Sequence, residues 1–391
     1  MKNKFSVIFI FLAFMMVIAS YKVTTSFALE KEVSNNFESK SAYLVDFDSG
    51  SVISKKNECE RLPIASMCKI MTLLLCFDEI ESDTIALDDV ICISENASGM
   101  GGSQIYLEEN GKYTINELIK GIVVASANDA CVAMAEHICG SEQEFVLKMN
   151  NKATELGMND TVFTNCTGLP KPGQYSCAKD VAKMFSELIK HEKYFDYSGI
   201  WMDKINHSKE RITEISNTNK LIKFYNGCDS GKTGYTSEAG HCICASAKRD
   251  NMRLISVVIG APNSKTRFKE ASDMFNYGFA NFTNKLIIDN AKPIDECISV
   301  KGGNTNTVKC IPEKPVYIFT NKNEKRSFEF DVVKNTNLKA PISKGDVVGE
   351  LVVYENGIEV TSVNLISLDA VKKANYFDNV KNIIEDMGLI G

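Results

Sequence analysis

The sequence predicts an α+β fold for the larger part of the chain, followed by a smaller all-β part. Strand-like segments at 41–53 come first, amphipathic helices fill the middle, and strand-like segments at 231–236, 241–247 and 254–260 follow. Helices clustered between two groups of strands are typical of an α+β domain. After residue 292 most segments are strand-like again, which predicts a second domain made of β-strands, in the manner of a small sandwich.

The composition fits a folded protein with a sizeable core. The chain has 391 residues, of which 44% are hydrophobic, and its formal net charge is −6. This length allows two domains, and this apolar fraction argues against global disorder. The acidic balance leaves no polybasic face, so no nucleic-acid partner is expected.

The first residues have the pattern of an export signal. Two lysines precede a nearly apolar run at 5–19, and Ser26-Phe27-Ala28 has the spacing of a cleavage site. The pattern predicts a signal peptide at 1–28 and an exported protein. An uncleaved membrane anchor is the alternative, although the apolar run is short for a membrane span.

The cysteines suggest neither a disulfide framework nor a metal site. The sequence has thirteen of them, an odd number that cannot all pair within one chain. Several, including Cys76, Cys131 and Cys139, occupy apolar positions of predicted helices, where a free cysteine acts as a small hydrophobe. Cys242-Ile243-Cys244 and four scattered histidines lack metal-ligand spacing. We therefore expect no metal and no other cofactor.

A candidate nucleophile and its base lie three residues apart, at Ser66 and Lys69. Pro63 favours a helix start just after it, and apolar residues recur at helical spacing over 70–77. Residues three apart share a helix face, so the Lys69 amine can reach the Ser66 hydroxyl. An amine in an apolar setting near a second cation loses its proton and can then accept one from serine.

A second polar motif, Ser126-Ala127-Asn128, lies between predicted helices at 115–125 and 129–139. The first of these helices starts with the capping-box pattern, a threonine followed three residues later by a glutamate. A junction between two helices can direct short polar side chains into a cleft. Alone, the motif would be explained as a turn and a helix cap.

The third motif, Lys232-Thr233-Gly234, lies in a predicted strand. Chance can supply one such triplet, but three motifs in this order are specific. With them the sequence resembles the low-molecular-mass, serine-type penicillin-binding proteins, the D-alanyl-D-alanine carboxypeptidases of peptidase family S11. The resemblance covers roughly 41–282 and, more loosely, the all-β part. It includes the segment 165–170, N-C-T-G-L-P, which is similar to the family's N-x-x-G-L-P.

The resemblance also implies a domain organisation. It predicts a penicillin-binding-protein/β-lactamase-like catalytic domain at 29–290, with an antiparallel sheet and a helical cluster. A small all-β domain at 291–368 and an amphipathic helical tail at 369–391 follow. The tail, with three lysines against four acids, either contacts the membrane surface or packs on the β domain. The implied location is the outer face of the cytoplasmic membrane or the cell wall.

The resemblance implies a serine acyl-transfer mechanism on peptidoglycan stem peptides. Ser66 attacks the carbonyl of the penultimate D-alanine while Lys69 takes its proton. Ser126 relays a proton to the departing D-alanine, and water then hydrolyses the acyl-enzyme. β-Lactam antibiotics are expected to inhibit by acylating Ser66.

The other implied roles concern binding and charge stabilisation. Asn128 hydrogen-bonds the substrate peptide, while Lys232 and Thr233 bind its terminal carboxylate. Gly234 lets the substrate lie close to the strand. The backbone N–H groups of Ser66 and Tyr235 form the oxyanion hole. Arg267 is either a further carboxylate contact or a solvated residue at a helix start.

Two features depart from the family pattern. Cys68 stands where family members commonly have threonine, and Asp229-Ser230-Gly231 differs from the usual D-G-hydrophobic run. Because the Cys68 side chain need not face the cleft, we expect it to tune the activity without abolishing it.

Three other functions are alternatives to this one. A class A β-lactamase would use Glu155 to deacylate, but Gly157 falls where a helix should end. The segment 227–233 resembles a phosphate-binding loop, but its spacing is one residue short and a strand follows. A catalytically silent wall-binding protein would be expected to lack Lys69 or Lys232, and both are present.

Overall fold

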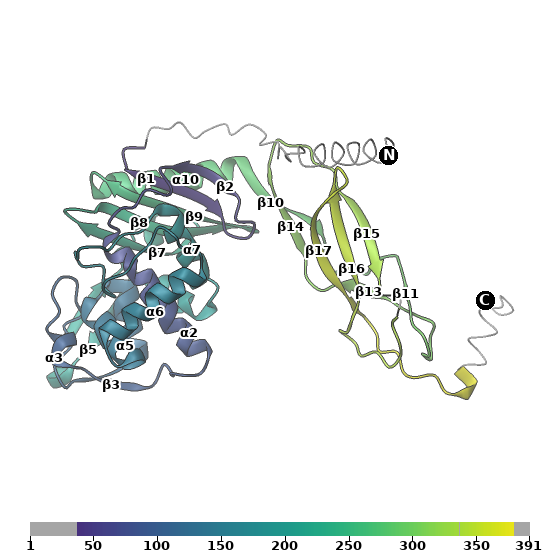
Figure 1. Ribbon diagram of the computed structural model, residues 1–391, viewed down its shortest axis with the longest axis horizontal. Coiled ribbons are helices and arrows are strands. Elements are labelled where there is room, and N and C mark those ends of the chain that lie inside the picture. Colours follow the sequence, from purple (N-terminus) through teal and green to yellow (C-terminus); the bar gives the residue numbers. More distant parts are fainter. Residues whose placement is uncertain (1–36, 336, 379–391) are drawn as a thin grey trace, which may run out of the picture. The chain divides into compact units, whose positions relative to one another are not determined.

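The structure, a computed structural model, describes residues 37–335 and 337–378. The predicted signal peptide and the tail from residue 379 onward lie outside these residues. The described chain forms an α+β part followed by a part made of β-strands (Figure 1). No helix within the described ranges is both long and apolar enough to cross a membrane.

The α+β part is built on one antiparallel sheet with the strand order β2-β1-β9-β8-β7. Its strands are β1 (Ser41–Asp46), β2 (Val52–Lys56), β7 (Cys228–Thr236), β8 (Gly240–Arg249) and β9 (Met252–Ala261). The N-terminal hairpin joins the three later strands because β1 pairs with β9. The predicted α+β class is confirmed. Strand β7 lies at an edge, so one row of its backbone groups is not used by the sheet.

Helices cover both faces of this sheet (Figure 1). Helix α10 (Ser264–Asn281) packs on β8 and β9, and α7 (Ala178–Leu188) packs on β9 and β1 from the other side. Helix α2 (Lys69–Glu81) packs on α7 and α5 and is buried nearly all round, which is typical of a core helix. The remaining α-helices are α3 (Glu95–Ser98), α4 (Ile115–Lys120), α5 (Asn128–Cys139), α6 (Glu142–Glu155), α8 (Phe195–Ser198) and α9 (Leu221–Phe224).

Short elements connect these helices. One two-stranded sheet pairs β3 (Val90–Cys92) with β4 (Lys112–Thr114), and another pairs β5 (Met202–Asn206) with β6 (Ile212–Ser216). The predicted capping box is confirmed at Thr114 and Glu117. The 3₁₀ turns are η1 (Ala65–Cys68), η3 (Glu192–Tyr194) and η4 (Ser208–Glu210), and the segment η2 (Gly121–Ala125) is a π-helix.

The C-terminal part consists of antiparallel strands. A four-stranded sheet has the order β13-β17-β16-β15, β10 pairs with β14, and β11 pairs with β12. Their bounds are β10 (Phe282–Ile288), β11 (Ile298–Ser299), β12 (Thr307–Val308), β13 (Cys310–Pro312), β14 (Val316–Asn321), β15 (Glu329–Lys334), β16 (Val347–Glu355) and β17 (Ile358–Ser367). Asn356 and Gly357 have φ of 52° and 76° between β16 and β17, which confirms the predicted two-residue hairpin turn.

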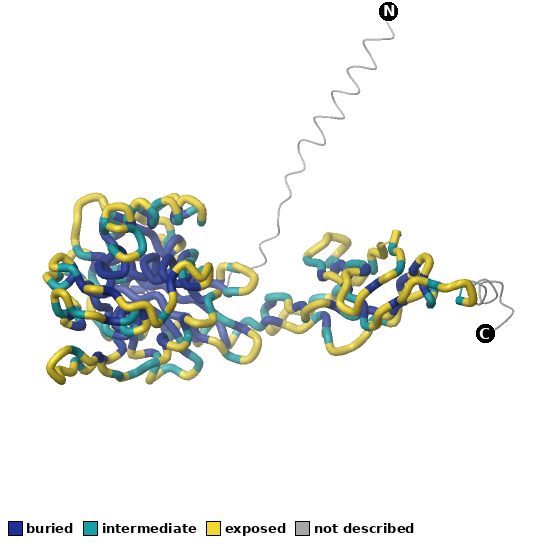
Figure 2. Tube along the Cα trace, turned by 90° about the horizontal axis from the view of Figure 1, so that it is seen from below, coloured by how far each residue is buried: buried dark blue, intermediate teal, exposed yellow. Residues whose placement is uncertain are grey.

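Burial differs between the two parts. Buried residues are concentrated in the five-stranded sheet and its helices, while many residues of the C-terminal part are exposed (Figure 2). The predicted tail helix begins later than expected, because Val371 and Lys373 form β-bridges and helical residues start at 376. Most of that predicted helix lies outside the described residues.

Candidate active site

Ser66 and Lys69 meet as the spacing predicts. Ser66 lies in the 3₁₀ turn η1 and Lys69 begins α2, so the pair spans the turn–helix junction and not the first turn of one helix. The Ser66 Oγ to Lys69 Nζ distance is 3.0 Å. Lys69 is fully buried, and burial lowers the pKa of its amine. The structure therefore places the candidate nucleophile beside an amine that gives up its proton more readily than an exposed lysine.

Two glycines allow the turn that carries Ser66 to pack closely. A Cβ on Gly234 would lie 2.6 Å from the carbonyl oxygen of Ile64, and one on Gly168 would lie 2.1 Å from that of Ala65. Ala65 itself has a φ of 47°, a strained value for a residue with a side chain. The atoms nearest to Gly234 belong to Ile64, Ala65 and Ser66, so the absence of a side chain at Gly234 allows β7 to pack on the turn 65–68, here called the nucleophile turn. The sequence did not predict this packing role of Gly234.

Three side chains of the η1–α2 junction hold the segment 165–167. The Cys68 thiol donates to the carbonyl of Asn165 at 3.3 Å, and the Thr72 hydroxyl donates to the carbonyl of Cys166 at 2.7 Å. Lys69 Nζ donates to the carbonyl of Thr167. The predicted N-x-x-G-L-P segment therefore lies against the turn of Ser66 and against Lys69, the candidate nucleophile and base. Cys68 faces this segment, as expected for a side chain that need not enter the cleft.

Ser126 and Asn128 are placed by an irregular helix junction. The π-helix η2 ends at Ser126, whose φ and ψ of 63° and 35° are left-handed. π-Helical turns and strained residues occur frequently at functional sites. Asn128 N donates to the carbonyl of Ser103 and its Nδ2 to that of Gly101, both at 2.7 Å. Ser126 Oγ and Asn128 Oδ1 are buried and form no hydrogen bond within the described chain, which suits groups that bind a ligand.

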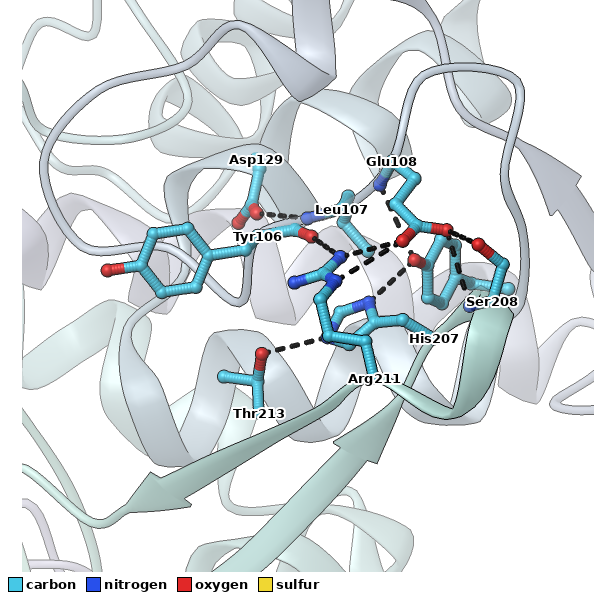
Figure 3. Close-up of polar contacts among 9 residues, drawn as sticks. Tyr106, Leu107, Glu108, Asp129, His207, Ser208, Arg211 and Thr213 are labelled. Atoms are coloured by element: carbon cyan, nitrogen blue, oxygen red, sulfur yellow. Dashed lines mark hydrogen bonds and ion pairs between the residues drawn. The ribbon is translucent and has the colours of Figure 1, made fainter.

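A polar network behind this junction was not predicted (Figure 3). The buried carboxylate of Asp129 accepts hydrogen bonds from the backbone N–H groups of Ile105, at 3.1 and 3.2 Å, and of Leu107, at 3.0 Å. Arg211 donates to the carbonyl of Tyr106 at 2.7 Å and pairs with Glu108. Only one feature of the sequence indicates this network, which is the position of Asp129 next to Asn128.

The hairpin that carries Arg211 is fixed by further contacts. His207 joins Thr213, at 2.8 Å from its Nε2, to Tyr113, at 2.7 Å from its Nδ1 (Figure 3). Burial lowers the pKa of His207. The contacts of His207 hold the β5–β6 hairpin against Tyr113, and those of Arg211 hold it against the loop 101–108.

Lys232 and Thr233 are buried on β7, the strand that packs on η1. Lys232 Nζ has no hydrogen-bond partner in the described chain. Burial, and then the charges of Lys69 and Arg267, lower the pKa of Lys232 well below its usual value. An anion bound here would accept a hydrogen bond from the unpaired Lys232 amine and would offset the positive charges around it, so it would stabilise the charged form of Lys232.

Tyr235 and Arg267 flank this lysine. Tyr235 is exposed, and its ring stacks on His241 with 4.4 Å between centroids. Arg267 is buried and donates to the carbonyls of Gly234, at 3.0 Å, and Cys242, at 3.3 Å. The alternative of a solvated helix start is therefore wrong for Arg267.

The alternative motifs do not form other sites. Glu155 ends α6, its side chain is 67% exposed and it pairs with Lys152, unlike a glutamate held over a buried nucleophile. The segment 227–233 enters strand β7 and no helix follows it.

One group of side chains has metal-ligand types. Asp160, Cys177 and Asp180 have ligand atoms within 4.8 Å of one another. Arg61 and Lys183 already pair with the two carboxylates, and burial raises the pKa of Cys177 to about 12. A neutral thiol and two paired carboxylates are a poor metal site. The thirteen cysteines all lie in the described ranges and are all free.

An S-x-x-K pair, an S-x-N junction and a K-T-G edge strand, on an antiparallel sheet with a helical cluster, define the penicillin-binding class of serine enzymes. A family model described as D-alanyl-D-alanine carboxypeptidase (peptidase S11) matches residues 27–263, and one described as the C-terminal domain of penicillin-binding protein 5 matches 282–373. The chain belongs to the D-alanyl-D-alanine carboxypeptidase family and is a serine-type hydrolase.

Individual relatives agree with this family. The chain is 40% identical to the D-alanyl-D-alanine carboxypeptidase DacF of Bacillus subtilis, covering 89% of this chain and 90% of DacF. It is similar to the crystal structure of penicillin-binding protein 5 from Haemophilus influenzae, with 31% identity, a TM-score of 0.67 and coverage of 86% and 98%. It is also similar to PBP3 from Streptococcus pneumoniae, with 26% identity, a TM-score of 0.74 and coverage of 86% and 100%.

Proposed function

We propose that this carboxypeptidase removes the terminal D-alanine from peptidoglycan stem pentapeptides through an acyl-enzyme on Ser66. The observation that carries the proposal is the 3.0 Å contact between Ser66 Oγ and the buried Lys69 Nζ. Neutral Lys69 accepts the Ser66 proton as the oxygen attacks the carbonyl of the penultimate D-alanine. The N–H groups of Ser66 and Tyr235 receive the oxyanion.

Collapse of the tetrahedral intermediate breaks the amide bond. The Ser126 hydroxyl gives its proton to the departing nitrogen and takes the proton held by Lys69, which becomes neutral again. The Asn128 amide hydrogen-bonds the acyl part of the substrate. Water then attacks the ester on Ser66, with Lys69 again accepting a proton. Lys69 returns this proton to the Ser66 oxygen as the acyl bond breaks, which gives the free acid and the original Ser66 hydroxyl.

Binding of the substrate carboxylate prepares this chemistry. The carboxylate pairs with Lys232 and hydrogen-bonds Thr233, so Lys232 keeps its proton. A charged Lys232 disfavours a second charge on its neighbour Lys69. The substrate thereby helps hold the base in its neutral form, and β-lactams, which carry a similar carboxylate, acylate Ser66 in the same way.

We further propose that residues 1–28 direct export and that the enzyme acts at the outer face of the cytoplasmic membrane or in the cell wall. The supporting observations are the charged and apolar N-terminal pattern and the nature of the substrate. The tail at 369–391 either contacts the membrane surface or packs on the β domain.

The test uses the chain from residue 29 and a peptide that ends in Lys-D-Ala-D-Ala. The parent protein is expected to release D-alanine and to be labelled by penicillin. Ser66→Ala should lose at least about 10³-fold in release and all labelling. Ser327→Ala, an exposed serine of the C-terminal part, is the matched control. Release by Ser66→Ala at the parent's rate would refute the assignment of the nucleophile.

A further inference from the structure

A groove of about 400 Å³ opens beside the nucleophile. Its walls come from residues 63–65, which precede Ser66, from the loop 168–174, and from Thr236 and Glu238 after the K-T-G motif. The backbone of residue 168 packs directly on the segment that precedes Ser66. A Cβ added to Gly168 would lie only 2.9 Å from the backbone nitrogen of Ser66. The groove is therefore continuous with the active site.

The direction of the substrate across β7 follows from the proposed function, on which this inference rests. The terminal carboxylate lies at Lys232 and Thr233, and the scissile carbonyl lies between the N–H groups of Ser66 and Tyr235. The peptide on the acyl side must then continue past Tyr235 toward Thr236. An extended chain advances about 3.3 to 3.6 Å per residue, so the residue before the penultimate D-alanine arrives at the groove. In a stem peptide that residue is the diamino acid.

The charged residues of the groove are Glu238 and Lys171. Both are exposed. The Glu238 carboxylate forms no hydrogen bond or ion pair with any described residue. Lys171 Nζ donates to the carbonyl of Thr164 at 3.0 Å, and an ammonium has two further protons to donate. The groove therefore offers one carboxylate and one ammonium to an occupant.

We propose that this groove is the subsite for the side chain of the diamino acid. Glu238 binds the side-chain ammonium, and Lys171 binds a carboxylate next to it. The subsite thereby selects a diaminodicarboxylic acid, whose side chain ends in both charges, over lysine, whose side chain ends in an ammonium alone.

The experiment compares kcat/KM for D-alanine release from four acetylated peptides X-D-Ala-D-Ala. X is diaminopimelate, lysine, aminoadipate or norleucine, which carry both side-chain charges, the ammonium, the carboxylate or neither. Each partly exposed ion pair is expected to change kcat/KM by about two- to five-fold. Glu238→Gln should remove the preference for lysine over norleucine, and Lys171→Gln the preference for diaminopimelate over lysine.

Glu192→Gln and Lys193→Gln are matched controls, because both residues are exposed and neither lines the groove. They should keep all the parent's preferences. The rate of Ser66 acylation by penicillin should be the same in all four variants. Release from the four peptides at equal rates, with normal acylation, would overturn the subsite alone. No release from any peptide would overturn the carboxypeptidase activity and the subsite with it.

Discussion

The thiol of Cys68 donates a buried hydrogen bond of 3.3 Å to the carbonyl of Asn165. This contact joins the turn that contains Ser66 to the segment that also accepts a hydrogen bond from Lys69. A threonine hydroxyl can make the same contact, so we expect Cys68→Thr to keep the parent's acylation rate. Cys68→Val should lower the free energy of unfolding by about 1 to 3 kcal/mol, because the Asn165 carbonyl loses its donor.

Urea unfolding and penicillin acylation measure the two effects of Cys68. Ser54→Val, on β2 and outside this contact, controls for the general cost of valine. Equal stability of Cys68→Val and Cys68→Thr would show that the thiol is a packing group only.

Gly234 is required for the approach of β7 to the nucleophile turn. Gly234→Ala would place a Cβ 2.6 Å from the carbonyl oxygen of Ile64 and 3.1 Å from the backbone nitrogen of Ser66. The strand or the turn must move, at a cost of about 1 to 3 kcal/mol in stability. Because the displaced nitrogen is the proposed oxyanion donor, acylation should slow by about 10²-fold or more.

The thermal midpoint and the acylation rate test this prediction together. Gly357→Ala, at the exposed hairpin turn where a Cβ meets nothing within 4 Å, is a control for the loss of a positive-φ glycine. It should be less stable with an unchanged acylation rate. An active, fully stable Gly234→Ala protein would contradict the close packing.

The activity should depend on pH through the two buried lysines. Burial lowers the pKa of Lys69, and only its neutral form accepts the Ser66 proton. The acylation rate should therefore rise with pH and level off below the usual lysine pKa of about 10.4. Deprotonation of Lys232 should weaken carboxylate binding and lower kcat/KM at higher pH. Lys69→Arg should be inactive at every pH, because a guanidinium stays charged.

The profile is measured as kcat/KM for D-alanine release and as penicillin acylation over about pH 5 to 10. A flat profile in both would contradict Lys69 as the base. Lys193→Arg, an exposed change, should leave the profile unaltered.

Local spacing predicted the parts of the site that lie within one motif, while the resemblance to the family joined the motif of Lys232 to those of Ser66 and Ser126. Ser66 and Lys69 are three residues apart, and Asn128 follows Ser126 at a helix junction, so chain geometry alone brings each pair together. The α+β class also followed from local patterns, because the strands β7, β8 and β9 and the helices α2, α6 and α10 are long and regular.

What the sequence left open depends on contacts between distant residues. The Asp129 carboxylate binds backbone groups more than twenty positions earlier, and Arg211 pairs with Glu108 across about a hundred. Residues that bind a buried carboxylate do not recur at a fixed spacing along the chain, so periodicity does not predict them. Strands β5 and β6 were missed for a related reason, since most of their residues are exposed and show no apolar alternation.

His191 should stabilise the protein more at low pH than at high pH. Its Nε2 lies 3.1 Å from Asp78 and its Nδ1 2.5 Å from Glu81, both on α2. The hydrogen bond to Asp78 is the largest cause of its raised pKa. The contribution is therefore complete below the unfolded pKa of about 6.5 and is lost as pH rises through the raised folded value.

His191→Gln should cost about 1 kcal/mol at pH ~6 and less at pH ~9. Urea unfolding at the two pH values measures the difference. His137→Gln, an exposed histidine in the last turn of α5, should show a much smaller change. A cost for His191→Gln that is the same at both pH values would mean that its packing on Phe77, and not its charge, stabilises the fold.

Asp129 should support the Ser126 junction without touching the substrate. Its carboxylate accepts hydrogen bonds from the N–H groups of Ile105, Leu107 and Ala130, and Figure 3 shows the one from Leu107. Asp129→Asn replaces one acceptor oxygen by an NH₂ group that faces donors, which should cost about 1 to 3 kcal/mol. The loop 101–107 would loosen, and because Asn128 is bonded to the same loop, acylation by penicillin should slow as well.

Glu108→Gln is the matched variant, because it removes the charge at the partly exposed end of the same network. It should lower the free energy of unfolding less than Asp129→Asn does, because an exposed pair contributes little, and it should leave the acylation rate near that of the parent. Comparison of unfolding and acylation in the two proteins separates a buried anchor from a surface pair. If Glu108→Gln slowed acylation as much as Asp129→Asn, the loop would be held chiefly by Arg211, and the buried carboxylate would be a secondary contact.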